Sequence, residues 1–210
     1  MWQRPPSPNH AGSQSANDSL NLSEIRSAEF TLEERATLLR VAHEAIVAAV
    51  EERAHSPAQA PAHLSAPRGV FTTLYRGDQL RGCVGYIIPI RPLFQAVAET
   101  AQAAAMHDTR FTPVERHELA EIHVSLSVLS PTFPIEPHQI EIGRHGLVIR
   151  RDGRRGLLLP QVATEHGWDT ETFLEQTCCK AGLPANAWKQ GAEIEAFTAE
   201  IFGDAGLHQF

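Results

Sequence analysis

The sequence lacks the features that mark membrane proteins, secreted proteins and disulfide-rich proteins. No apolar run approaches the roughly 18 residues that span a bilayer, and the N-terminus has no apolar segment of the kind found in secretory signals. The three cysteines are an odd number and two of them are adjacent, so they do not make a disulfide framework. This cysteine usage is typical of a reducing compartment, and we expect a cytoplasmic protein.

Basic residues are scarce as well. Lys and Arg together number 18 against 25 Asp and Glu, which gives a formal net charge of −7. Because nucleic-acid-binding proteins usually carry a basic field, this balance argues against a nucleic-acid partner. None of the 11 histidines stands in a tight ligand spacing with a cysteine pair, and no nucleotide-binding fingerprint occurs. We therefore predict no metal site, no cofactor and no membrane association.

The 210 residues divide by composition into a tail and a domain. Residues 1–28 are rich in Ser, Pro, Asn and Gly and show no apolar period. Such a segment cannot bury enough apolar surface to offset its ordering entropy, so it is predicted to be disordered and to contribute little to stability. Residues 29–210 are predicted to form the folded domain.

Within the domain, strands that come as hairpins alternate with amphipathic helices. Gly77-Asp78 and Asp152-Gly153 are two-residue hairpin turns. Thr31 with Glu34 predicts a capping box, and Asp169 predicts a second helix start. We predict an α+β fold with antiparallel sheets flanked by helices. The predicted helices cover 31–53, 92–106 and 169–182, and the strands cover 70–76, 79–88, 122–129, 146–151, 154–159 and 193–202.

The segment Leu80 to Gly85, with the sequence Leu-Arg-Gly-Cys-Val-Gly, is the strongest candidate for chemistry. On a strand, Arg81 and Cys83 share a face, and a guanidinium near a thiol lowers the pKa of that thiol. Gly82 and Gly85 weaken a strand, which suggests a bulge or the close approach of a ligand to the main chain. These features permit a nucleophilic, ligand-binding or anion-holding cysteine. The alternative is a buried structural cysteine with Arg81 in a salt bridge.

Three further candidates are weaker. Asp108 and Arg110 offer an acid and an anion-binding group, or simply pair with each other in a loop. Glu118 is a general acid or base, or an ordinary loop carboxylate. His123 lies on the polar face of the strand 122–129, where it contacts either a ligand or other groups of the sheet.

The Arg-Gly-Cys segment in this setting resembles the signature of the AMMECR domain family. The resemblance runs from about residue 33 to residue 202. Within it, Val84 stands where isoleucine is more usual. The similar segments, in order along the chain, are 69–74, 80–85, 108–111, 118–119, 123–129, 145–147, 157–163, 168–169, Cys178 and 180–183.

The resemblance implies two unequal lobes with a groove between them and with the Arg-Gly-Cys segment near the groove. It also implies component A of the AmmeMemoRadiSam system, acting with a Memo-like protein and a radical SAM protein. Two hypotheses follow: an enzyme or enzyme subunit that uses Cys83 and Arg81, or a non-catalytic adaptor that binds a peptide or a protein partner in the same groove.

We further predict that the candidate side chains converge on one pocket for an anionic small molecule or peptide. Gln161 follows Pro160 at the start of a short helix, where free N–H groups favour anions. The converging residues are Arg81, Cys83, Asp108, Arg110 and Gln161.

Overall fold

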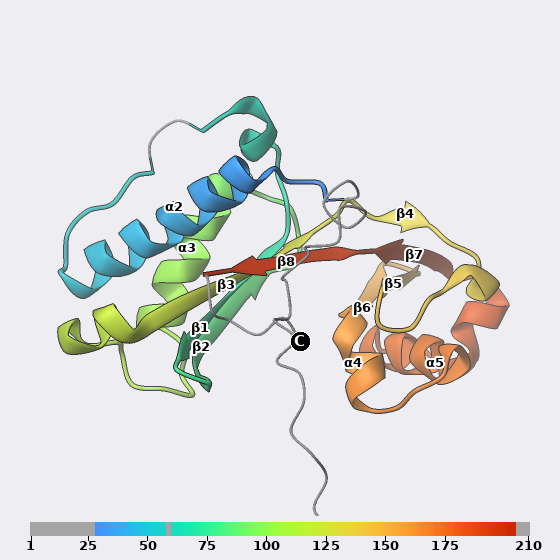
Figure 1. Ribbon diagram of the computed structural model, residues 1–210. Helices are drawn as coiled ribbons and strands as arrows, with labels where there is room; N and C mark the ends of the chain where they lie inside the picture. Colours follow the sequence, from blue (N-terminus) through green and yellow to red (C-terminus); the bar gives the residue numbers. More distant parts are fainter. Residues whose placement is uncertain (1–27, 58–59, 205–210) are drawn as a thin grey trace, which may run out of the picture.

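Two four-stranded antiparallel sheets lie next to each other in the computed structural model, which describes residues 28–57 and 60–204 (Figure 1). Each sheet carries its own helices and its own apolar core, so the molecule has two lobes. The predicted α+β class with antiparallel sheets is confirmed. The predicted tail lies outside the described residues except for residue 28. Within the described ranges, no helix combines the length and the apolarity needed to cross a membrane.

The first lobe is a sheet with helices on one of its faces (Figure 1). The apolar faces of α2 and α3 pack on the sheet through a core that includes Leu38, Ile46, Val97, Leu74 and Leu126. The strand order is β2-β1-β3-β8, so β2 is an edge strand. The elements are α2 (Leu32–Val50), η1 (Ala62–Ser65), β1 (Val70–Arg76), β2 (Gln79–Tyr86), α3 (Leu93–Met106), η2 (Arg116–Glu121), β3 (Ile122–Leu129) and β8 (Ala199–Gly203).

The second lobe is built on the sheet β4-β7-β5-β6, of which β6 is an edge strand. Phe173 and Leu174 of α5 are fully buried in its core. The elements are β4 (Phe133–Pro134), η3 (Pro137–Gln139), β5 (Gly146–Arg151), β6 (Arg154–Leu158), α4 (Pro160–Glu165), α5 (Thr170–Lys180), η4 (Ala185–Gln190) and β7 (Glu193–Phe197).

The predicted helix starts and hairpins are confirmed. The Thr31 hydroxyl accepts a hydrogen bond from the Glu34 N–H (3.2 Å), and the Glu34 carboxylate accepts one from the Thr31 N–H (2.9 Å). Asp169 accepts a hydrogen bond from the Thr172 N–H (2.8 Å) and caps α5. Both predicted two-residue turns are present: Arg76 pairs with Gln79 across the first and Arg151 with Arg154 across the second.

The prediction of one strand over residues 193–202 is wrong, because this segment forms two strands in two different sheets. β7 pairs with β5 in the second lobe, and β8 pairs with β3 in the first. The residue between them, Thr198, donates its N–H to the Ser130 hydroxyl (3.0 Å) and accepts the Ser130 N–H (2.9 Å). The two chain crossings between the lobes are therefore hydrogen-bonded to each other.

A small third core lies where the lobes meet. Leu129 from the first lobe and Val148 and Phe197 from the second are buried together, and Phe71 and Leu157 pack against them. Phe71 belongs to the sheet face of the first lobe that the helices leave uncovered. The uncovered face of the first sheet is thus turned toward the second lobe, and Cys83 is on that face.

Candidate functional site around Cys83

Cys83 lies on the uncovered face of the first sheet. Its neighbour Gly82 faces α3 and its neighbour Val84 packs on the first core, so alternation places Cys83 on the opposite side. The register pairs Cys83 with Thr73 and Thr73 with Ser125. The Thr73 hydroxyl donates a hydrogen bond to the Cys83 thiol (3.3 Å). Cys83 is therefore a half-buried thiol in a row of hydroxyl-bearing residues.

Tyr75 and His123 pair in the next row of the same face. Burial, and after it the charge of the nearby Cys83 thiol, raise the pKa of Tyr75. The predicted candidate His123 is thus on the same face as Cys83, half-buried on β3 opposite Tyr75 of β1. Its role in binding stays a prediction.

The main chain of Cys83 is held by two side chains from the loop after α3. The Cys83 N–H donates to Asp108 Oδ2 (2.8 Å), and Arg110 Nη2 donates to the Cys83 carbonyl (3.2 Å). Asp108 and Arg110 also pair with each other at 2.7 Å. Because β2 is an edge strand, these side chains take the place of a neighbouring strand at Cys83. The predicted ligand groups Asp108 and Arg110 bind the protein's own main chain.

The electrostatics of this pair keep it ionised. Hydrogen bonds from the Arg110 guanidinium, and then from the N–H groups of Cys83 and Arg110, hold the pKa of Asp108 well below its usual range. In turn the Asp108 carboxylate raises the pKa of Arg110, with a smaller contribution from the Cys83 thiol. Arg110 is therefore a cation near the thiol, but its charge is balanced by Asp108.

Arg81 binds elsewhere, which corrects its predicted role beside the thiol. The register shifts between Leu74 and Tyr75, so Arg81 has no partner on β1, and such a bulge re-aims a side chain. The Arg81 guanidinium donates to both oxygens of Glu118 (2.9 and 2.8 Å), and also to the carbonyls of Thr112 and Pro113. Arg81 therefore holds the segment after α3 in place, and its hydrogen bonds go to that segment instead of to the Cys83 sulfur.

Glu118 is a buried partner of Arg81 and not a free acid or base. Its side chain is 8% exposed. The Arg81 guanidinium lowers the pKa of Glu118 to about 2, helped by the N–H of Glu115. At neutral pH both Arg81 and Glu118 are charged and form an ion pair.

Of the two predicted explanations for Gly82 and Gly85, the bulge is present, at Arg81 next to Gly82. The approach of a ligand to these glycines stays a prediction. A Cβ atom at Gly82 would lie 2.2 Å from the carbonyl oxygen of Ala104 in α3. A Cβ atom at Gly85 would lie 2.3 Å from the ring of Phe71. The space beside each glycine is filled by the protein itself, so these residues are needed for packing.

The predicted anion pocket is not assembled. Gln161 is exposed on α4 of the second lobe, and no described contact joins it to the Cys83 clamp. Arg81 and Arg110 are each neutralised by a carboxylate. Within residues 28–57 and 60–204 no cluster of three or more His, Cys, Asp or Glu side chains is arranged to hold a metal ion.

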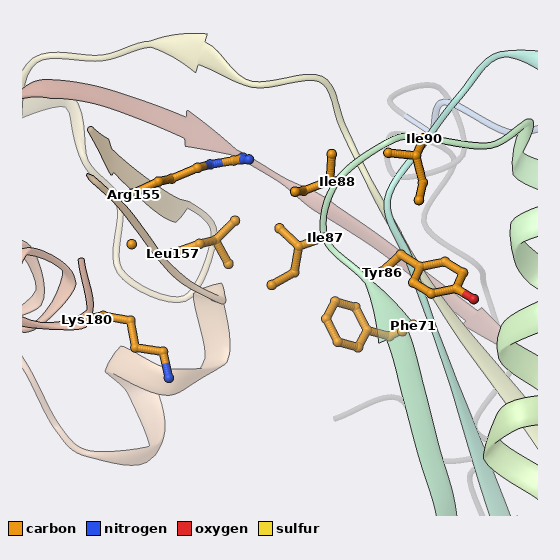
Figure 2. Close-up of a pocket in the computed structure, with 10 residues that line it drawn as sticks. Phe71, Tyr86, Ile87, Ile88, Ile90, Arg155, Leu157 and Lys180 are labelled. Atoms are coloured by element: carbon orange, nitrogen blue, oxygen red, sulfur yellow. The ribbon is translucent and has the colours of Figure 1, made fainter. Parts of the chain in front are cut away.

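Sequence reasoning missed a cavity of about 510 Å³ between the edges of the two sheets. Figure 2 shows isoleucines of the loop after β2 facing Arg155 and Leu157 of β6. The signal that could have revealed it is Ile87-Ile88-Pro89-Ile90, an apolar run in a loop, where Ile88 and Ile90 are 53% and 69% exposed. Cys83 is not among its lining residues. The lining residues are Phe71, Gly85, Tyr86, Ile87, Ile88, Ile90, Arg155, Gly156, Leu157 and Lys180.

Comparison with known proteins places the chain in a family. The profile of the AMMECR1 family matches residues 39–202, and the chain belongs to this family. A protein from Methanopyrus kandleri is 44% identical over 186 residues, which cover 83% of this chain and 90% of the relative. A protein from Thermococcus gammatolerans is 47% identical over 158 residues, covering 70% and 77%.

A solved structure shows the same fold. The crystal structure of an uncharacterised protein from Pyrococcus horikoshii matches with a TM-score of 0.65 at 40% identity. The match covers 80% of this chain and 90% of that one. The similarity therefore includes most of both lobes.

Proposed function

We propose that this protein binds a ligand on the uncovered face of the first sheet, at the Cys83 thiol, as an enzyme subunit that works with a Memo-like protein and a radical SAM protein. The observation that carries the proposal is the clamp on Cys83. A buried carboxylate and an arginine hold its N–H and C=O, while its thiol stays half-exposed. Removing the Asp108 carboxylate from water costs free energy, and the buried carboxylate positions this one residue.

The surroundings of the thiol support contact with a ligand. The Thr73 hydroxyl donates a hydrogen bond to the sulfur and so orients the Cys83 side chain. Ser125 continues the row on β3, and Tyr75 and His123 add a phenol and an imidazole in the next row. These groups offer hydrogen bonds to a polar ligand lying across the strands, with the sulfur at one end.

The adaptor alternative is favoured by a different observation. Thr73 donates a hydrogen bond to the thiol, and in the described part of the chain Arg81 and Arg110 are both paired with carboxylates. A positioned thiol without a general base in contact suits binding as well as catalysis. In that case the same face holds a peptide or a protein partner and the chemistry takes place on the partner.

The test is to co-express the full chain with the Memo-like and radical SAM proteins of the same organism, to isolate the complex, and to follow iodoacetamide labelling of each cysteine by mass spectrometry. We expect a complex in which Cys83 is labelled at least tenfold more slowly than in the free chain. The exposed Cys179 of the second lobe is the internal control, and its rate stays the same.

The Cys83→Ser variant separates the two hypotheses. If the protein is an enzyme subunit, the complex forms but its reaction is lost. If it is an adaptor, the complex and its reaction both persist. A free chain that forms no complex, with Cys83 labelling unchanged, contradicts the proposal in both forms.

A further inference from the structure

The cavity between the lobes combines an apolar floor with two cations. Phe71, Ile87 and Leu157 supply apolar surface from both lobes, and Arg155 and Lys180 stand on the side of the second lobe (Figure 2). Its volume of about 510 Å³ lies in the range of ligand-binding clefts. Cys83 does not line it, although Phe71 and Gly85 pair on the same sheet face, one row from Thr73 and Cys83.

The two cations have no carboxylate partner among the residues that the structure describes. Within the described part of the chain, no Asp or Glu oxygen lies within ion-pairing distance of Arg155 or Lys180. On the same hairpin, Arg150 pairs with Glu195 and Arg151 pairs with Asp152. In a protein of net charge −7, two unpaired cations beside apolar surface are complementary to a carboxylate-bearing ligand.

The main chain around the cavity also has hydrogen-bonding groups that no strand of the two described sheets pairs with. β6 is an edge strand, and the pair Arg151–Arg154 closes its two-residue turn, so Arg155 and Leu157 direct their N–H and C=O groups outward. On β2 the Cys83 N–H points outward to Asp108, so Gly85, two residues on, has the same orientation. An exposed strand edge of this kind accepts an added strand.

We propose that the cavity binds an extended peptide segment of a partner protein, which adds to the edge of β6, places apolar side chains against Phe71, Ile87 and Leu157, and presents a carboxylate to Arg155 and Lys180. A peptide matches all three features: main-chain groups for the strand edge, apolar side chains for the floor, and an acidic residue or chain end for the cations. At the clamped part of β2 such pairing is blocked by Asp108 and Arg110.

The experiment selects random heptapeptides displayed on phage against the full chain. A double variant, Arg155→Glu with Lys180→Glu, reverses the charge at the cavity. A matched variant, Arg40→Glu with Arg116→Glu, makes the same change in net charge at two exposed residues of the first lobe. We expect the selected peptides to contain alternating β-branched residues and an Asp or Glu. The cavity variant loses their binding at least tenfold, and the matched variant keeps it.

Two synthetic forms of the best peptide then identify the binding mode. A proline placed at its centre removes a main-chain donor and abolishes binding, and amidation of its C-terminus tells whether the carboxylate is a side chain or a chain end. Amide exchange at Leu157 slows when the peptide is bound. The proposal is overturned if no acidic apolar peptides are enriched, or if their binding survives the cavity variant. It is also overturned if the protein alone forms a dimer that this variant dissociates, because the occupant is then a second copy.

Discussion

At the residue scale, burial distinguishes the cysteines. Cys83 is half-buried on an uncovered sheet face, whereas Cys178 is fully buried and its burial raises the pKa of its thiol. We expect Cys83 in the native chain to react with iodoacetamide at least tenfold faster than Cys178, because a thiolate is the reactive form. Mass spectrometry of each labelled peptide measures the two rates. Labelling of Cys83 only after unfolding would rule out a ligand-contacting thiol.

The charge of Arg110 is balanced by Asp108, so removing that balance should change the reactivity of Cys83. In Asp108→Asn the Arg110 guanidinium loses its anionic partner while remaining near the thiol. We expect the ratio of labelling by iodoacetate to labelling by iodoacetamide to rise about threefold, because an exposed cation attracts the anionic reagent modestly. Thr73→Ser, which keeps a hydroxyl beside the sulfur, is the control. An unchanged ratio would show that Arg110 does not act on the thiol.

The Arg81–Glu118 pair predicts a pH dependence of stability. The folded-state pKa of Glu118 is lowered to about 2 from 4.5, so its contribution is complete above pH 4.5 and is lost as the pH falls toward 2. At pH 7 we expect Glu118→Gln to reduce the free energy of unfolding by about 3 kcal/mol, because Arg81 loses a buried partner. The difference from the original protein narrows between pH 4.5 and pH 2. Urea unfolding over this range is the measurement.

Glu121→Gln is the matched control for that prediction, because Glu121 pairs with Arg76 at an exposed position. Its effect at pH 7 should be much smaller than that of Glu118→Gln. Equal effects of the two variants would contradict a special role for the buried pair.

The side-chain directions of Arg81 and Cys83 are only partly predictable from the sequence. Alternation along a strand correctly implies that Cys83 is turned away from Gly82, but it also places Arg81 beside Cys83. The bulge opposite Leu74 and Tyr75 breaks the alternation at Arg81. Gly82 indicates a bulge in this segment, but no local pattern shows that Arg81 is the residue it re-aims, because that depends on how two strands pair and on Glu118 lying 37 residues further along the chain.

At the element scale, the contact between β2 and α3 depends on Gly82. Any side chain there meets the Ala104 carbonyl, which is backbone and cannot move without displacing the helix. We expect Gly82→Ala to reduce the free energy of unfolding by about 2–3 kcal/mol. Leu80→Ala, at an exposed position of the same strand, is the control and should have little effect. Chemical denaturation compares the variants, and equal stabilities would show that helix and strand separate easily.

Elements fixed by local chemistry were the ones predicted best. The Thr31–Glu34 box, the Asp169 cap and both hairpin turns depend on residues a few positions apart, and all are present. The sequence predicts one strand over residues 193–202, and no glycine or proline in the segment marks a break. Its division at Thr198 is decided by pairing with Ser130, β5 and β3, which are distant in sequence.

At the scale of the whole molecule, the lobes are joined by paired crossings and by a small shared core. Neither lobe can separate without exposing Phe197, Val148 and Leu129, which are at most 3% exposed. Burial of a few large side chains contributes several kcal/mol. The lobes are therefore expected to unfold together, although each has its own core.

Phe197→Ala tests this coupling, because the ring fills the junction and also packs on Gly146. Removing it should cost about 3–5 kcal/mol and let the lobes unfold separately.

Trp168 and Trp188 both belong to the second lobe, so in a Trp2→Phe background tryptophan fluorescence follows that lobe, while far-UV circular dichroism follows both. In the protein that keeps Phe197, the urea transition followed by fluorescence and the one followed by circular dichroism should coincide. In Phe197→Ala they should differ in midpoint, whereas Leu38→Ala, confined to the first core, should lower both together. Coincident transitions in Phe197→Ala would show that the crossings at Ser130 and Thr198 couple the lobes without the shared core.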